Sequence, residues 1–145
     1  INQEIEKQRD FILINFANPD MVGHTGNLQA TIKAIEVVDL NLGEILNRMM
    51  QKQYKVLVTA DHGNCEEMIN IITGGIDKEH SVSPVPLLFV DNIRKIEMVN
   101  SNQSILEIAS KQPIGILADV APTLLDFMCL NKPTEMTGQS LNGLL

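Results

Sequence analysis

Three short, nearly continuous apolar runs constrain the fold of this chain more than any other feature of its sequence. They occupy residues 11–16 (FILINF), 55–60 (KVLVTA) and 85–90 (VPLLFV). The first ends at Asn-Pro-Asp and the second at Asp-His-Gly-Asn, which are turn compositions. Runs of this kind are typical of strands that are buried on both faces. The sequence therefore predicts three strands that share one core.

A long amphipathic helix is expected between the first two strands. Apolar residues recur at spacings of three and four from Leu28 to Met49, which makes one stripe along a helix. Gly43 lies inside this stripe, costs about 1 kcal/mol of helix propensity and allows a bend. A strand, a helix and a strand in this order imply a right-handed crossover and a mostly parallel sheet with helices on its faces. The expected fold class is α/β.

The last third of the chain is less regular. Residues 91–118 mix polar residues with short apolar pieces that could hold a small strand or helix. Asp119 is expected to cap a helix that runs to about Leu130, with Pro122 in the first turn, where its missing N–H costs nothing. No repeat and no interdomain linker is evident, so one domain is expected.

Charge and composition exclude several classes of partner. Eighteen Asp and Glu against eleven Lys and Arg give a net charge of −7, which disfavours nucleic acid and anionic membranes as partners. Cys65 and Cys129 are expected to be reduced thiols. No apolar run approaches the roughly twenty residues of a membrane span, and the cytoplasm is the expected compartment. The first residue is Ile1 rather than Met, which suggests a piece of a longer protein.

The three histidines and two of the aspartates are the residues that indicate a functional site. The chain has only three histidines, and all lie in turn-like segments. In open α/β sheets the carboxyl ends of the strands form the ligand crevice, where two of the apolar runs would deliver an aspartate each. The candidate metal ligands are Asp20, His24, Asp61, His62 and His80.

The spacing of these residues sets conditions on a metal site. Asp20 and His24 are four residues apart and face the same side if the chain enters a helical turn. Asp61 and His62 are neighbours, so they converge only if the chain turns, or else they face two different ions. His80 would return to the site from the loop between residues 64 and 83.

A donor set of carboxylate oxygen and imidazole nitrogen suits Mn²⁺ or Zn²⁺ better than Mg²⁺ or Ca²⁺, which favour oxygen alone. Five ligands are too many for one open catalytic site and too few for two complete ones. The alternative for each Asp–His pair is a cap with an imidazole that faces the solvent.

Other reactive residues have simpler interpretations. Cys65 could be a ligand or a reactive thiol, but a small buried side chain is the simpler interpretation. Glu66 and Glu67 could act as acid and base, although acids after a turn commonly favour a helix N-terminus. Lys78 and Glu79 are expected to be solvated. No serine stands in a strand-to-helix elbow or beside an evident base; the serines are Ser81, Ser83, Ser101, Ser104, Ser110 and Ser140.

Five motifs in the same order resemble the cofactor-independent phosphoglycerate mutase family. They are residues 18–26 (NPDMVGHTG), 59–64 (TADHGN), 80–86 (HSVSPVP), 119–123 (DVAPT) and 135–138 (EMTG). The resemblance extends from about residue 11 to the C-terminus. Ser81 and Ser83 depart from the residues that are frequent in the family, but neither is a proposed ligand.

The resemblance implies an alkaline-phosphatase-like domain, in which helices cover both faces of a mostly parallel sheet in three layers. That domain holds two Mn²⁺ ions around a serine that is transiently phosphorylated. By motif, Asp20, His24 and His80 resemble the ligands of one ion, and Asp61 and His62 those of the other. Residues 1–145 would be the C-terminal portion of the domain. The nucleophilic serine, a further aspartate and the separate transferase domain would lie outside this chain.

The implied reaction interconverts 3-phosphoglycerate and 2-phosphoglycerate in glycolysis and gluconeogenesis. The 145-residue chain alone is expected to be inactive and to bind one ion more tightly than the other. The family is usually monomeric, and the surface left by a missing half would allow self-association. A phosphopentomutase-like enzyme and a non-catalytic metal-binding module are the alternatives.

Overall fold

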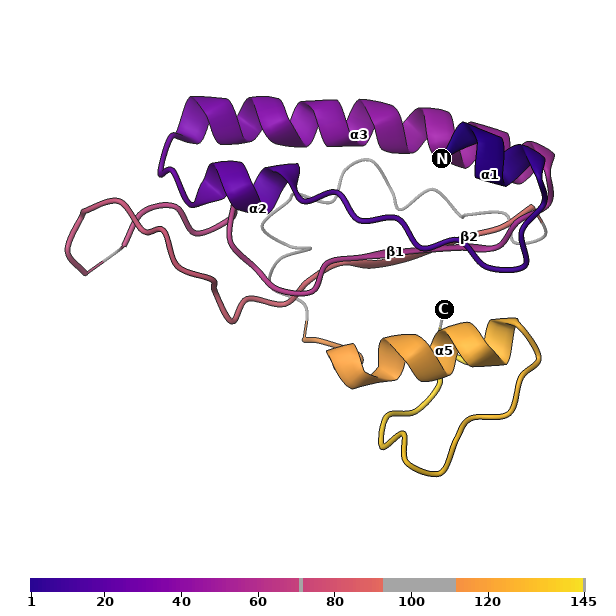
Figure 1. Cartoon of the computed structure of the whole chain (residues 1–145). Helices are drawn as coiled ribbons and strands as arrows, with labels where there is room; N and C mark the ends of the chain where they lie inside the picture. Colours follow the sequence, from indigo (N-terminus) through magenta and orange to yellow (C-terminus); the bar gives the residue numbers. More distant parts are fainter. Residues whose placement is uncertain (71, 93–111, 145) are drawn as a thin grey trace.

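The computed structural model describes residues 1–70, 72–92 and 112–144 (Figure 1). Its regular elements are joined by long loops, which carry most of the polar residues of interest. In chain order the elements are α1 (Asn2–Glu6), α2 (Asn18–Gly23), α3 (Leu28–Gln51), β1 (Val56–Thr59), β2 (Leu87–Val90), the 3₁₀ turn η1 (Leu117–Asp119) and α5 (Val120–Phe127).

The long helix is confirmed, with a start at the residue that the apolar stripe predicts. Asn27 caps α3, because its side-chain oxygen accepts a hydrogen bond from the Ala30 N–H at 3.1 Å. The helix runs to Gln51, two residues past the last residue of the stripe, and Gly43 does not interrupt it. A Cβ at Gly43 would meet no other atom within 4 Å, so no packing contact requires a glycine there.

The second and third apolar runs form strands, but the two strands are antiparallel. Val56 pairs with Val90 and Thr59 pairs with Leu87 in a two-stranded sheet. The mostly parallel sheet is therefore not formed by the described residues. Apolar runs predict which residues are buried, but they do not encode the direction of the neighbouring strand.

The first apolar run is not a strand among the described residues, so this prediction was wrong. Ile12, Ile14 and Phe16 pack against the core, whereas Phe11 and Leu13 are 51% and 82% exposed. The segment thus buries one face rather than two. No described strand pairs with its backbone, and pairing is what defines a strand.

The principal apolar cluster lies at the C-terminal end of α3. Ile5 of α1 packs there against Ile45 and Met49 of α3, and Val56 of β1 joins them from the sheet. Figure 1 shows α1 beside this end of α3 and α2 beside the opposite end. The apolar cluster and α2 are therefore held at opposite ends of one helix.

The last helix covers the other side of the sheet from α3 (Figure 1). The ring of Phe127 in α5 stacks on Phe89 of β2 with centroids 4.0 Å apart. The predicted helix is confirmed, but it ends at Phe127 rather than near Leu130, and Cys129 follows with a positive φ of 56°.

Asp119 precedes α5 without capping it by its side chain, contrary to the prediction. Its carboxylate instead accepts the backbone N–H groups of Ile116 and Gln139, at 2.9 and 2.8 Å. These backbone hydrogen bonds lower the pKa of Asp119. The buried Thr123 hydroxyl donates to the Asp119 carbonyl at 2.7 Å and accepts from the Leu141 N–H at 2.9 Å. The C-terminal tail is thereby tied to the start of α5.

Residues 93–111 lie outside the described residues, and with them most of the region where a small element was expected and Ser101, Ser104 and Ser110. Within the described ranges, none of the helices combines the length and the apolar character that crossing a membrane requires.

Candidate metal centre

The short helix α2 brings the first two candidate ligands together. The turn composition Asn-Pro-Asp begins a short helix with Pro19 at its start, so residues four apart share a face. His24 Nε2 lies 3.2 Å from Asp20 Oδ1. The condition set by the spacing, that the chain turns helically after Asp20, is therefore met.

The ring of His24 is oriented by the loop that carries His80. His24 Nδ1 hydrogen-bonds to the carbonyl of Lys78, and because a carbonyl can only accept, Nδ1 carries the proton. In the neutral tautomer with this proton, the lone pair is on Nε2. His80 Nε2 lies 3.1 Å from His24 Nε2 and 3.1 Å from Asp20 Oδ1.

His62 completes the group from the loop after β1. Its ring stacks on His80 with centroids 3.7 Å apart and planes inclined by 18°. His62 Nε2 lies 4.0 Å from Asp20 Oδ1. Its Nδ1 is buried and has no hydrogen-bond partner in the described part of the chain. One ligand atom each from Asp20, His62 and His80 fall within 4.8 Å of one another.

Asp61 lies at the exposed edge of this group. Its Oδ1 lies 3.6 Å from His62 Nε2, but its side chain is 91% exposed. The structure thus brings Asp20, His24, His62 and His80 together and leaves Asp61 at the rim.

The donor chemistry of this group fits a divalent metal ion. Three imidazole Nε2 atoms lie 3.1–4.0 Å from one carboxylate oxygen. Shared protons or a bound cation would each stabilise such an arrangement, and all four side chains are of types that bind metal ions. Imidazole and carboxylate ligands together suit Mn²⁺, Zn²⁺ and neighbouring transition metals.

Comparison with known families is consistent with a metal site. The family model of the metalloenzyme superfamily matches residues 1–132 of the chain. The chain belongs to the metalloenzyme superfamily.

Relatives of this metalloenzyme chain include named enzymes. It is 45% identical over 136 residues to the 2,3-bisphosphoglycerate-independent phosphoglycerate mutase of Clostridium acetobutylicum, covering 94% of this chain and 24% of that protein. It is 48% identical over 140 residues to the enzyme of the same name from Vesicomyosocius okutanii, covering 96% and 25%. The chain spans about a quarter of the length of these relatives. The resemblance to this family is confirmed.

A solved structure is also similar to this metalloenzyme chain. It is Leishmania mexicana phosphoglycerate mutase at low cobalt concentration, with a TM-score of 0.63 and 27% identity. The match covers 87% of this chain and 24% of the Leishmania protein.

Asn64 lies beside Asp20 in this candidate site, a placement that the sequence did not indicate. It is 7% exposed, and its side-chain amide donates to Asp20 Oδ1 at 3.4 Å. A Cβ at Gly23 would overlap the Asn64 side chain, so the glycine makes room for this approach. The turn composition at residues 61–64 predicted a bend but not this contact.

Glu66 has a role other than the expected one, because no helix follows it in the described residues. Its carboxylate accepts hydrogen bonds from the Asn64 N–H, at 2.9 Å, and from the Ser81 hydroxyl. Burial raises the pKa of Glu66, but the hydrogen bonds from Ser81 and the backbone outweigh it and lower the pKa overall. The interpretation of Glu66 as a helix-starting residue was therefore wrong.

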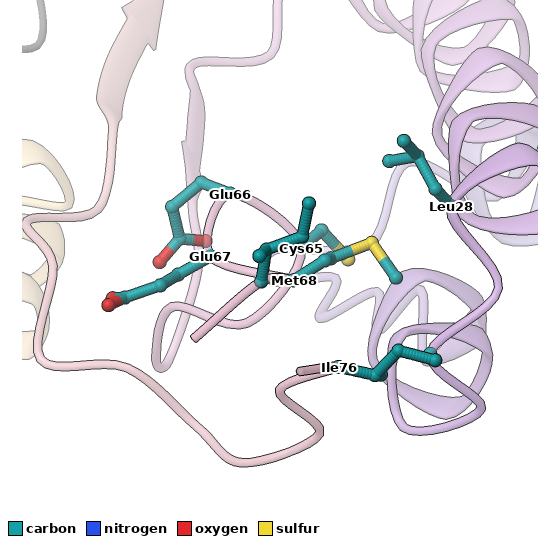
Figure 2. Close-up of a pocket in the computed structure, with 8 residues that line it drawn as sticks. Leu28, Cys65, Glu66, Glu67, Met68 and Ile76 are labelled. Carbon is teal, nitrogen blue, oxygen red and sulfur yellow. The ribbon is translucent and has the colours of Figure 1, made fainter. Parts of the chain in front are cut away.

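Cys65 lies against the start of α2 rather than among the candidate ligands. Burial, reinforced by the carboxylates of Glu66 and Asp20, raises the pKa of its thiol, which donates to the Pro19 carbonyl at 3.2 Å. Cys65 also lines an apolar cavity of about 480 Å³ together with Leu28, Met68 and Ile76 (Figure 2). None of the five candidate ligands lines this cavity, but Glu66 and Glu67 do, so the cavity lies beside the metal centre.

Proposed function

We propose that this chain is the C-terminal, metal-binding portion of the phosphatase domain of a phosphoglycerate mutase. The complete enzyme would interconvert 3-phosphoglycerate and 2-phosphoglycerate through a phosphoserine, in the cytoplasm. The convergence of three imidazole Nε2 atoms on one oxygen of Asp20 carries the proposal. The names of the relatives favour this substrate over a phosphopentose.

The residues divide between two ions, for which Mn²⁺ is the proposed metal. Asp20, His24 and His80 would hold one ion, and Asp61 and His62 would contribute to the other. Two divalent cations held there would supply Lewis-acid chemistry, lowering the pKa of a serine nucleophile and neutralising phosphoryl oxygens. The Lys78 carbonyl holds His24 with its Nε2 lone pair toward the site.

The rest of the machinery belongs to other parts of the complete protein. We propose that the nucleophilic serine, a further aspartate and the transferase domain lie outside this chain, which spans about a quarter of its relatives. The complete domain would also supply the strands of a mostly parallel, three-layer sheet. The chain alone would then have no mutase activity.

Titration calorimetry with Mn²⁺ tests the metal centre directly. We expect the wild-type chain to bind Mn²⁺, and His24→Ala and His80→Ala each to weaken that binding. Absence of binding by the wild-type chain, or unchanged binding by both variants, would reject the metal centre and favour a non-catalytic module. Mutase turnover by the 145-residue chain would contradict the proposed division of the enzyme.

A further inference from the structure

The two loops that carry His62 and His80 are joined directly beside these histidines. The Ser81 N–H donates to the Gly63 carbonyl at 2.9 Å in an antiparallel bridge. Gly63 follows His62 and Ser81 follows His80, so the bridge fixes the backbone one residue from each ring. The stacking of the two rings at 3.7 Å is consistent with this connection.

The Glu66 carboxylate bridges the same two loops. One oxygen of Glu66 accepts the Asn64 N–H at 2.9 Å, and the other accepts the Ser81 hydroxyl. The Ser81 oxygen also accepts the Ser83 N–H, at 3.2 Å, so it is fixed from both sides. Glu66 thereby connects the loop of His62 to the loop of His80.

The absence of a side chain at residue 63 makes this connection possible. A Cβ at Gly63 would overlap both the Ser81 hydroxyl and the Glu66 carboxylate. The connection extends to α2, because the Asn64 side chain donates to Asp20 Oδ1 at 3.4 Å. Glu66 is thus linked through Asn64 to Asp20 and through Ser81 to the residue that follows His80, and Asn64 itself lies two residues after His62.

We propose that Glu66 and Ser81 are positioning residues that set the separation of His62 and His80, an inference that rests on the proposed metal centre. Neither residue is a ligand. Residues that orient metal ligands commonly change metal affinity by about 10–100-fold when they are removed. Glu66 is exposed and contributes little apolar burial, so its removal acts mainly through the loss of the two hydrogen bonds that its carboxylate accepts.

Glu67 provides a matched control for Glu66. It is the next residue, it is also exposed, and its replacement by alanine removes the same charge. We expect Glu66→Ala and Ser81→Ala to weaken Mn²⁺ binding about 10–100-fold in calorimetry. Glu67→Ala should leave the affinity near that of the wild type. The double variant Glu66→Ala/Ser81→Ala should be no weaker than the weaker single variant, since both remove one connection.

Two further measurements separate positioning from a general loss of structure. The visible absorption of the Co²⁺-loaded chain should change in Glu66→Ala but not in Glu67→Ala, because it reports the ligand geometry. In the metal-free chain, the nuclear Overhauser contact between the His62 and His80 rings should be lost only in Glu66→Ala and Ser81→Ala. The variant Ser81→Thr keeps the hydroxyl and should therefore retain the contact between the two rings.

Equal effects of Glu66→Ala and Glu67→Ala on affinity would show that only charge matters and would overturn the positioning role. So would a lower unfolding midpoint of metal-free Glu66→Ala with unchanged affinity and unchanged ring contact. If the wild-type chain binds no Mn²⁺, the metal centre fails as well, and that result is distinct from binding that Glu66→Ala leaves intact.

Discussion

The C-terminal end of α3 packs into the apolar cluster of Ile5, Ile45 and Met49, whereas its N-terminal end leads to α2 and the histidines. We call these the core end and the site end. At the core end, Ile5 is fully buried and the contacts are apolar. At the site end, hydrogen bonds and lone pairs dominate, and Leu28 and Ile32 of α3 are 48% and 43% exposed. The two ends should therefore respond to different perturbations.

The largest expected effect is at the core end. Ile45→Ala should lower the free energy of unfolding by about 2–5 kcal/mol, because it leaves a cavity among packed side chains. Urea unfolding measures this loss, and the affinity for Mn²⁺ should not change. Ile32→Ala is the matched control on the same helix, with a smaller expected loss because Ile32 is 43% exposed. Equal losses for both variants would mean that the core end is not specially packed.

Metal should stabilise the chain through the site end. At a concentration of Mn²⁺ about 100 times its dissociation constant, binding adds about 2.7 kcal/mol to the stability of the folded state. His80→Ala should abolish this gain and leave the metal-free unfolding free energy nearly unchanged. Ile45→Ala should keep the gain. A gain that disappears in Ile45→Ala would show that the two ends are coupled.

The N-cap residue of α3 tests whether a less stable helix also lowers the affinity of the site for Mn²⁺. Asn27→Ala should cost about 1 kcal/mol, because the Ala30 N–H loses its acceptor. Asn27→Ser should retain most of the stability. Thermal unfolding measures both variants, and Mn²⁺ calorimetry shows whether the loss of the cap also disturbs Asp20 and His24.

The smallest expected effect on stability is that of a substitution in the middle of α3, between the two ends. Gly43→Ala should raise the free energy of unfolding by up to about 1 kcal/mol, since Gly43 is helical and a Cβ there meets nothing within 4 Å. Metal affinity should stay constant if α3 is a passive connection. A decrease in stability would indicate a packing partner at Gly43.

Local patterns predicted the core end better than the site end. The spacing of apolar residues placed α3 to within two residues, because one face of a helix must be buried. The runs at 55–60 and 85–90 gave the strand positions for the same reason. The run at 11–16 failed, and so did the strand direction, because backbone pairing depends on neighbours that are distant in sequence.

At the site end, residue type predicted the candidate ligands, and the structure brings four of the five together. Asp61 remains at the rim, where its side chain is 91% exposed. Asn64 and Glu66 could not be assigned from the sequence. Their partners Asp20 and Ser81 are 44 and 15 residues away, and nothing in a turn composition specifies such contacts.

The sequence separation of Asp20 and His80 also determines how long the ribosome takes to add His80 after Asp20. These residues are 60 positions apart, and a chain that grows at about 5–20 residues per second needs about 3–12 seconds to cross that interval. During this time the growing chain offers only Asp20 and His24, and later Asp61 and His62. A complete set of imidazoles exists only after His80 has left the ribosome. The proposed metal centre can therefore be completed only after His80 has been synthesised.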